Sequence, residues 1–209
     1  MKKFFTAVPL QAITDDLGTL TYRAVGNTRL QMEDPVSFPI LTVVNGYAQP
    51  EEDFRLIAVS PDTDAARRNL QRLTDQLMAL CARRRLSCPG GVELVTTGGD
   101  ERVSTHVETF QKLLDYVDND DELFFCMTFG TKPLSQAMML ALQYAYRVKR
   151  NASISCIVYG EIDRTGPKPW RTGNVYDMTA LTQLDEIVHL LADRGVADPR
   201  AALASILSL

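Results

Sequence analysis

The strongest constraint on the fold of this 209-residue chain is a regular alternation of strand-like and helix-like segments. Apolar runs of strand length are separated by longer segments whose apolar residues recur every three or four positions. The expected strands are residues 3–9, 19–25, 54–60, 92–96, 122–127, 153–159 and 175–178, and the expected helices are residues 60–85, 105–117, 135–150, 180–194 and 199–209. Because parallel strands require such crossovers, the alternation predicts an α/β fold, a Rossmann-like three-layer sandwich with a mainly parallel sheet and helices on both faces.

Residues 38–47 admit two interpretations. Asn45-Gly46 suits a hairpin turn between two short strands. Alternatively, Ser37 caps a helix that has Pro39 in its first turn and its apolar residues on one face. We favour the helix, because a strand follows at residues 54–60 and a parallel strand needs a crossover.

Several local signals set further boundaries. A capping box, Thr105 to Glu108, opens one helix, and Thr179 caps the helix that begins at residue 180. The acidic residues 118–121 are expected in a solvated turn. Residues 161–172, which include Pro167, Pro169 and Trp170, are expected in an extended surface loop.

The charge balance limits the class of ligand. The chain carries 22 Lys and Arg against 26 Asp and Glu, a formal net charge of −4. This balance does not favour a broad basic face for long DNA or RNA. A local basic pocket for a small anionic ligand is compatible with it, so we expect a pocket rather than a groove.

The cysteines and the N-terminal segment bear on metal binding and location. Cys126 and Cys156 lie inside apolar runs, no CxxC pair occurs, and His106 is far from His189 in sequence, so no zinc site is expected. The apolar start of the chain is broken at Pro9, so no signal peptide is expected, and no segment is long enough to span a membrane. We expect a protein of the reducing cytoplasm, with neither metal nor organic cofactor.

The segment from Met127 to Ser135 predicts an anion site. It joins the apolar run 122–126 to an amphipathic helix through a tight turn that contains Gly130, several hydroxyl groups and one lysine. The free N–H groups and the positive dipole end of a helix N-terminus favour phosphate. The candidate ligand-binding residues here are Thr128, Phe129, Gly130, Thr131, Lys132, Ser135 and Gln136. Thr131 is equally well placed to cap the helix.

Other polar turns follow strands of the same expected sheet. Ligands of parallel sheets bind beyond the carboxyl ends of the strands, so these turns are expected to meet the Thr128–Lys132 turn at one rim. The additional candidates are Pro9, Leu10, Gln11, Thr96, Thr97 and Gly98. Asn45 and Tyr47 suit contact with an adenine edge or face, and suit turn and core positions equally.

His106 and the first strand bear on catalysis. His106 lies in the first turn of an expected helix, where it suits a general base, a group that stacks on a base, or an exposed residue without a role. The first strand is followed by Val8-Pro9-Leu10-Gln11 rather than by GxGxxG. A nicotinamide- or flavin-dependent enzyme is therefore not expected.

The run Thr128-Phe129-Gly130-Thr131-Lys132-Pro133 between a strand and a helix resembles the motif of CARF domains, the CRISPR-associated Rossmann fold. The closing run Val175-Tyr176-Asp177-Met178-Thr179 before a helix resembles the end of one CARF subgroup. The chain departs from the motif at Cys126, where an acidic or amide residue is common, and at Phe129, which replaces a glycine. Phe129 has the size to shield a ligand or to stack on it.

The resemblance implies a sensor of cyclic oligoadenylate, the second messenger of type III CRISPR antiviral signalling. It implies a single CARF-like domain over residues 1–209 with a helical extension at residues 180–209. Such a chain is either a stand-alone sensor or the sensor portion of a longer protein, in which the extension leads to an effector domain. It also implies a homodimer, or a higher oligomer of dimers, in which two equivalent Thr-Lys turns line one pocket that binds cyclic tetra- or hexa-adenylate.

An alternative is a ring nuclease, an enzyme that degrades the messenger it binds. Metal-independent cleavage uses the ribose 2′-hydroxyl as nucleophile, and the protein orients it and stabilises the developing charge. Lys132 and Thr131 are candidates for that stabilisation, and His106 is a candidate proton acceptor.

Overall fold

The computed structural model describes residues 1–11, 13, 18–165, 168 and 170–208. The chain divides into two compact units, Met1–Asp177 and Met178–Leu209. The division lies two residues before the C-terminal extension expected from the sequence. The unit Met1–Asp177 contains the sheet.

In the described part of the chain, seven strands form one sheet in the order β2-β7-β6-β5-β1-β3-β4. Their bounds are β1 (Lys2–Ala7), β2 (Thr21–Val25), β3 (Phe54–Pro61), β4 (Val92–Thr97), β5 (Glu122–Cys126), β6 (Ser153–Ile162) and β7 (Thr172–Asp177). Strands β1, β3, β4, β5 and β6 are mutually parallel, whereas β7 is antiparallel to β6 and β2 follows the direction of β7. The mainly parallel sheet confirms the predicted α/β fold class.

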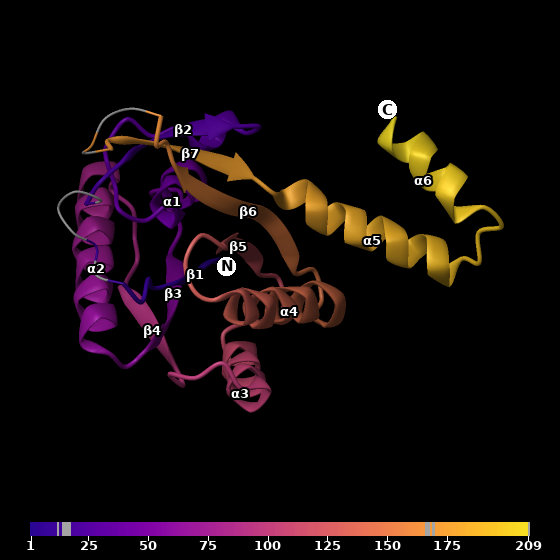
Figure 1. Ribbon diagram of the computed structural model, residues 1–209, viewed down its shortest axis with the longest axis horizontal. Helices are drawn as coiled ribbons and strands as arrows, with labels where there is room; N and C mark the ends of the chain where they lie inside the picture. The colour runs from indigo at the N-terminus through magenta and orange to yellow at the C-terminus, as the bar shows by residue number, and fades with distance from the viewer. Residues whose placement is uncertain (12, 14–17, 166–167, 169, 209) are drawn as a thin grey trace. The chain divides into compact units, whose positions relative to one another are not determined.

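Helices cover both faces of this sheet (Figure 1). One face carries α1 (Ile40–Tyr47) and α2 (Asp64–Arg84), and the other carries α3 (Val103–Leu114) and α4 (Lys132–Val148). Residues 38–47 therefore contain the predicted helix, not a hairpin. The short 3-10 helix η2 (Thr28–Leu30) packs beside α1.

Both faces of the sheet are apolar because helices cover both of them. The side chains of each strand alternate between the two faces. On the α1 and α2 side, the Phe4 ring stacks on Phe124 at 4.5 Å and meets Phe54 edge-on at 5.3 Å. The next residues along the same strands, Phe5 and Phe125, are fully buried on the opposite side. This double burial explains why the central strands are continuous apolar runs.

Three predicted helix caps, at Ser37, Thr105 and Thr179, are wrong. Ser37 donates its hydroxyl to the Gly18 carbonyl, and α1 begins after Pro39 without a side-chain cap. The capping box at Thr105 is absent, because α3 begins at Val103 and the Thr105 hydroxyl donates to Asp100 at 2.6 Å. Thr179 is itself the first residue of the helix that it was predicted to cap, and Met178 occupies the N-cap position without a side-chain hydrogen bond.

Two strand ends also differ from the prediction. Residues 60 and 61 complete β3 instead of opening α2, because Ser60 and Pro61 pair with the end of β4, and Thr63 caps the helix. Glu161 and Ile162 belong to β6 and pair with β7, so the expected surface loop is shorter than predicted. The predicted loop residues Pro167 and Pro169 lie outside the described residues.

The turn before β5 holds a buried ion pair rather than only solvated acids. The Lys3 ammonium lies 2.6 Å from Asp121 and 2.8 Å from Asp118, and the Lys3 and Asp121 side chains are each 2% exposed. The hydrogen bond from Lys3 holds the pKa of the Asp118 carboxyl below its usual range. The pair therefore connects β1 to the segment that enters β5.

The unit Met178–Leu209 contains α5 (Thr179–Asp193) and α6 (Pro199–Leu207). Asp198 caps α6 by accepting a hydrogen bond from the Ala201 N–H at 2.9 Å. Neither helix has a buried residue among its described side chains. No helix in the described ranges of the chain is both long and apolar enough to cross a membrane.

We predict that Lys3→Met lowers the free energy of unfolding by about 3 kcal/mol, because the buried Asp121 carboxylate loses the nearer of its two cations and keeps only the N-terminal ammonium, at 3.5 Å. The double variant Lys3→Met, Asp121→Asn is expected to regain at least half of that loss. The contribution of Asp118 is present above the ordinary aspartate pKa of about 4 and is lost as pH falls through its lowered pKa. Urea unfolding between pH 3 and pH 7 tests this, and a gap between wild type and Lys3→Met that does not narrow below pH 4 would contradict it.

Candidate functional site

A cavity of about 980 Å³ lies beyond the carboxyl ends of β1 and β5 and beside the end of β6. Three segments line it: the turn after β1, the turn between β5 and α4, and the β6–β7 hairpin, with a floor from β2 and the segment before α1. The lining residues are Pro9, Leu10, Gln11, Ile13, Leu20, Tyr22, Ser37, Thr128, Phe129, Gly130, Thr131, Tyr159, Gly160, Glu161, Ile162, Asp163, Arg164, Thr165 and Asn174. Two of the three turns expected at one rim therefore meet at this cavity.

The β5–α4 turn is fixed by close backbone approaches on both sides. The Gly160 N–H donates a hydrogen bond of 2.7 Å to the Thr128 hydroxyl, which joins the turn to β6. A Cβ atom at Gly160 would lie 2.3 Å from Pro39 Cγ, so only glycine fits there. Gly130 has a φ of +91°, and a Cβ on it would lie 2.9 Å from Ala7. The sequence thus specifies the turn through two glycines and one threonine.

The N-terminus of α4 adjoins the cavity. Thr131 caps the helix by accepting a hydrogen bond from the Leu134 N–H at 3.4 Å, and it donates its hydroxyl to the Glu101 carboxylate at 2.9 Å. Thr131 lines the cavity, whereas Lys132, the first residue of α4, and Ser135 and Gln136, which follow in the helix, do not. Lys132 is exposed. The predicted cation therefore stands at the rim of the cavity rather than in its wall.

The turn after β1 is held by α2. The Asn69 side chain, which is 4% exposed, donates to the carbonyl oxygens of Pro9 and Gln11, each at 2.8 Å. These bonds satisfy backbone groups that follow the strand and fix the wall opposite Thr128. The candidate residues Pro9, Leu10 and Gln11 are thus positioned by a residue that the sequence analysis did not single out.

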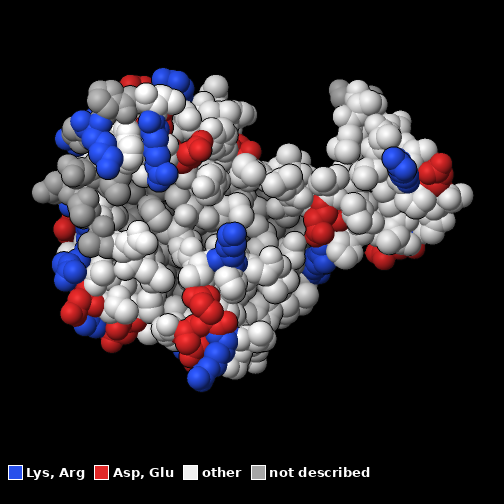
Figure 2. Space-filling view, viewed as in Figure 1, with Lys and Arg blue, Asp and Glu red and all other residues white. Residues whose placement is uncertain are grey.

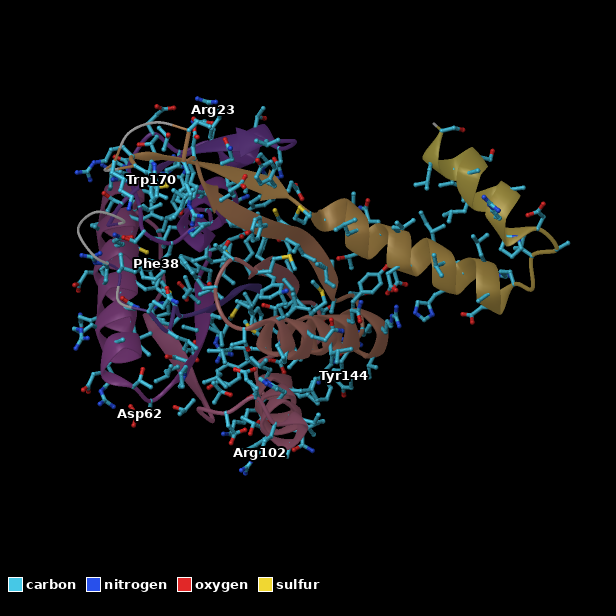
Figure 3. The ribbon with its side chains drawn as sticks, in the orientation of Figure 1. Arg23, Phe38, Asp62, Arg102, Tyr144 and Trp170 are labelled. Carbon is cyan, nitrogen blue, oxygen red and sulfur yellow. The ribbon has the colours of Figure 1, made fainter. Side chains whose placement is uncertain are left out.

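Aromatic side chains form much of the apolar lining. The Phe129 ring packs edge-on against Phe38, with centroids 5.9 Å apart, and Phe38 is marked in Figure 3. Tyr22 is buried in the floor and Tyr159 is 43% exposed at the mouth. A flat, partly apolar ligand can contact such walls over its face.

The β6–β7 hairpin gives the cavity an acidic side. Glu161 and Asp163 line it together with one cation, Arg164. Thr165 donates two hydrogen bonds to Asp163, at 2.6 and 3.0 Å, and these lower the pKa of the Asp163 carboxyl. Elsewhere, on the face in Figure 2, Lys and Arg are interspersed with Asp and Glu. One wall therefore holds the N-terminus of α4, and the hairpin wall holds two carboxylates and one guanidinium.

Five candidate residues lie away from the cavity. Thr97 is buried and shares a 2.7 Å hydrogen bond with Thr109 of α3, and Gly98 packs against Thr105, so the end of β4 (Thr96 and Thr97) and Gly98 after it lie against α3. Asn45 and Tyr47 lie in the last turn of α1, whereas its first turn adjoins Gly160. The Tyr47 hydroxyl accepts a 2.8 Å hydrogen bond from Asn27 and its ring packs on Phe124.

His106 lies in α3 and is linked to Thr131 through the Glu101 carboxylate. Its Nε2 atom is 3.1 Å from the Glu101 carboxylate that also binds the Thr131 hydroxyl, and the side chain is 12% exposed. The Nδ1 atom is buried and has no hydrogen-bond partner within the described residues. His106 does not line the cavity, but it is linked to the cavity wall through one shared carboxylate.

Cys126 and Cys156 are fully buried, as their apolar context predicts. Burial raises the pKa of the Cys126 thiol. Among the residues that the structure describes, no group of three or more His, Cys, Asp or Glu side chains is arranged to hold a metal ion.

The sequence did not predict that the β6–β7 hairpin lines the cavity, because Gly160 interrupts the apolar pattern of β6. A glycine inside a strand often marks the close approach of another segment, here Pro39, and that signal would have extended the strand. Comparison of the sequence with protein-family models and with curated proteins gives no match. The site is therefore interpreted from its own geometry.

We predict that Thr128→Val lowers the free energy of unfolding by about 1–3 kcal/mol, because the N–H of the buried Gly160 loses its acceptor. Gly160→Ala should cost a similar amount, since the added methyl collides with Pro39. Gly99→Ala is the matched control, because a Cβ there meets open space. Thermal and urea unfolding measure all three, and equal stability of Gly160→Ala and Gly99→Ala would contradict the described packing.

Proposed function

We propose that this protein is a CARF-type sensor that binds cyclic tetra- or hexa-adenylate in the cavity beyond β1 and β5, in type III CRISPR antiviral signalling in the cytoplasm. The ligand then regulates an effector that follows the helical unit after Asp177. One observation carries the proposal: the Thr128–Thr131 turn, on which the resemblance to CARF domains rests, forms a wall of the large cavity.

The chemistry of that wall supports an anionic ligand. In the first turn of α4 the Lys132 N–H has no intrahelical acceptor, whereas the Leu134 N–H is bound by Thr131. The dipole of the helix is positive at this end, and the Lys132 side chain adds a full charge. Pro133, the second residue of α4, has no backbone N–H that would need an acceptor. Phosphate oxygens match these donors better than any neutral group does.

The size of the cavity supports a ligand shared between two copies of the chain. A volume of about 980 Å³ lies at the top of the range of roughly 300–1,000 Å³ that encloses one drug-sized molecule. A ring of four or six nucleotides is larger than such a molecule. A twofold-symmetric dimer presents two equivalent cavities to one cyclic ligand, and we propose this homodimer as the binding form.

We predict that Lys132→Ala weakens binding of cyclic tetra-adenylate about tenfold to a hundredfold, the effect of losing a charge-assisted hydrogen bond to phosphate. The free protein should keep its stability or gain slightly, since a cation at a helix N-terminus opposes the dipole. Calorimetry with both rings and thermal unfolding measure the two effects.

Lys149→Ala is the control for Lys132→Ala, because Lys149 follows the other end of α4 and the change in net charge is the same. It is expected to bind like wild type. An affinity of Lys132→Ala equal to that of Lys149→Ala would remove Lys132 from the site. Failure of wild type to bind either ring would refute the sensor function itself.

A ring nuclease is the second candidate, and the link between Thr131, Glu101 and His106 favours it. In-line attack of the ribose 2′-hydroxyl on the adjacent phosphorus breaks the bond to the 5′-oxygen, which takes a proton from water and becomes a 5′-hydroxyl, and leaves a 2′,3′-cyclic phosphate. The protein would accept the 2′-hydroxyl proton and stabilise the charge on the phosphate.

We predict that, if the ring is cleaved, cleavage proceeds in EDTA and falls at least a hundredfold in His106→Gln, because a positioned acid or base contributes about that much. Liquid chromatography of cyclic tetra-adenylate after long incubation separates ring from linear product. Intact ligand with the wild-type protein would leave the sensor function alone, and equal rates in both proteins would exclude His106 as the proton acceptor.

A further inference from the structure

Arg164 places a positive charge in the wall of the cavity. Among the described residues that line the cavity, Arg164 is the only lysine or arginine, whereas Lys132, the cation predicted from the sequence, lies outside the lining. The Arg164 side chain is exposed, and its guanidinium forms no ion pair and no hydrogen bond with any residue that the structure describes. Its N–H donors are therefore left to solvent or to a ligand.

The two carboxylates of the same hairpin wall are bound by other donors. Glu161 accepts a hydrogen bond of 2.9 Å from the Tyr176 hydroxyl of β7. Asp163 accepts two hydrogen bonds from Thr165, at 2.6 and 3.0 Å. Both carboxylates are thus anchored within the hairpin, and neither neutralises Arg164 by direct contact.

The side chain of Trp170 orders Arg164 without using its donors. The guanidinium carbon lies 5.5 Å from the centre of the Trp170 ring, within the range of a cation–π contact. Trp170, which is marked in Figure 3, is half-buried at the end of the loop that joins β6 to β7. A contact of this kind holds a guanidinium in place while its N–H groups stay available for a hydrogen-bond acceptor.

These features fit a phosphate group. A planar guanidinium with available donors binds phosphate through two parallel hydrogen bonds. Glu161 and Asp163 repel an anion elsewhere on the hairpin wall, which restricts phosphate to the position of Arg164. A cyclic oligoadenylate carries one phosphate per nucleotide, so a subsite on the hairpin can be occupied at the same time as the N-terminus of α4.

We propose that Arg164 is a phosphate-binding residue of the cavity and forms a second anion subsite on the β6–β7 hairpin, in addition to the N-terminus of α4. This inference rests on the proposed binding of cyclic oligoadenylate. It assigns a contact to a residue outside the Thr128–Lys132 turn, and it makes Trp170 a positioning residue that acts through Arg164.

Arg164→Ala tests the inference. We expect cyclic tetra-adenylate to bind about tenfold to a hundredfold more weakly, as for one lost charge-assisted hydrogen bond to phosphate. The affinity of the variant should also fall less steeply than that of wild type as salt is added, because one phosphate contact is gone. The melting temperature of the free protein should not change, since the removed side chain is exposed.

Lys168→Ala is the matched control. The Lys168 ammonium lies 4.9 Å from the centre of the same Trp170 ring, and its removal changes the net charge by the same amount, but Lys168 does not line the cavity. This variant is expected to bind like wild type. Equal affinities of Arg164→Ala and Lys168→Ala would overturn the inference alone, as would a salt dependence of Arg164→Ala that matches wild type.

Two double variants test the subsite further. The losses from Arg164→Ala and Lys132→Ala should add, because the two residues hold different phosphates, and a double variant no weaker than the single ones would overturn the second subsite. Trp170→Leu should weaken binding by itself and cause no further loss in the Arg164→Ala background, whereas a further loss there would remove its positioning role. Failure of wild type to bind any ring would overturn the proposed function, and this inference with it.

Discussion

Parallel pairing of β1 with β3 on one side and β5 on the other is the constraint on which the rest of the structure depends. It forces each connection to cross a face of the sheet, so both faces are buried and the central strands are apolar throughout. It also brings the ends of β1 and β5 to the same edge. The cavity lies there because the turns that follow these strands diverge to opposite faces.

The antiparallel β6–β7 hairpin gives this edge its particular chemistry. It extends past the end of β5 and adds a wall with Glu161 and Asp163 opposite the N-terminus of α4. The pocket therefore has the N-terminus of α4 on one side and a wall of mixed charge, with Glu161, Asp163 and Arg164, on the other.

The alternation of apolar segments was sufficient to predict the fold class, the helix at residues 40–47 and the turn at Thr128–Thr131, because burial and turn chemistry are local in sequence. The rest depends on residues distant in sequence. The sequence predicts that the strand ends before Gly160, whereas the strand continues and Pro39 packs against this glycine. The sequence also predicts a solvated Asp121, whereas its carboxylate pairs with Lys3. Tyr22 reaches the cavity through Gly173 of another strand, so periodicity within β2 gives no sign of it.

Amide hydrogen exchange with and without cyclic tetra-adenylate tests the central claim most directly, because it reports where a ligand acts on the whole chain. The account predicts slower exchange in residues 9–11, 128–131 and 159–165, the three segments that line the cavity. Exchange that is unchanged in all three, or slowed only in segments remote from the cavity, would contradict it.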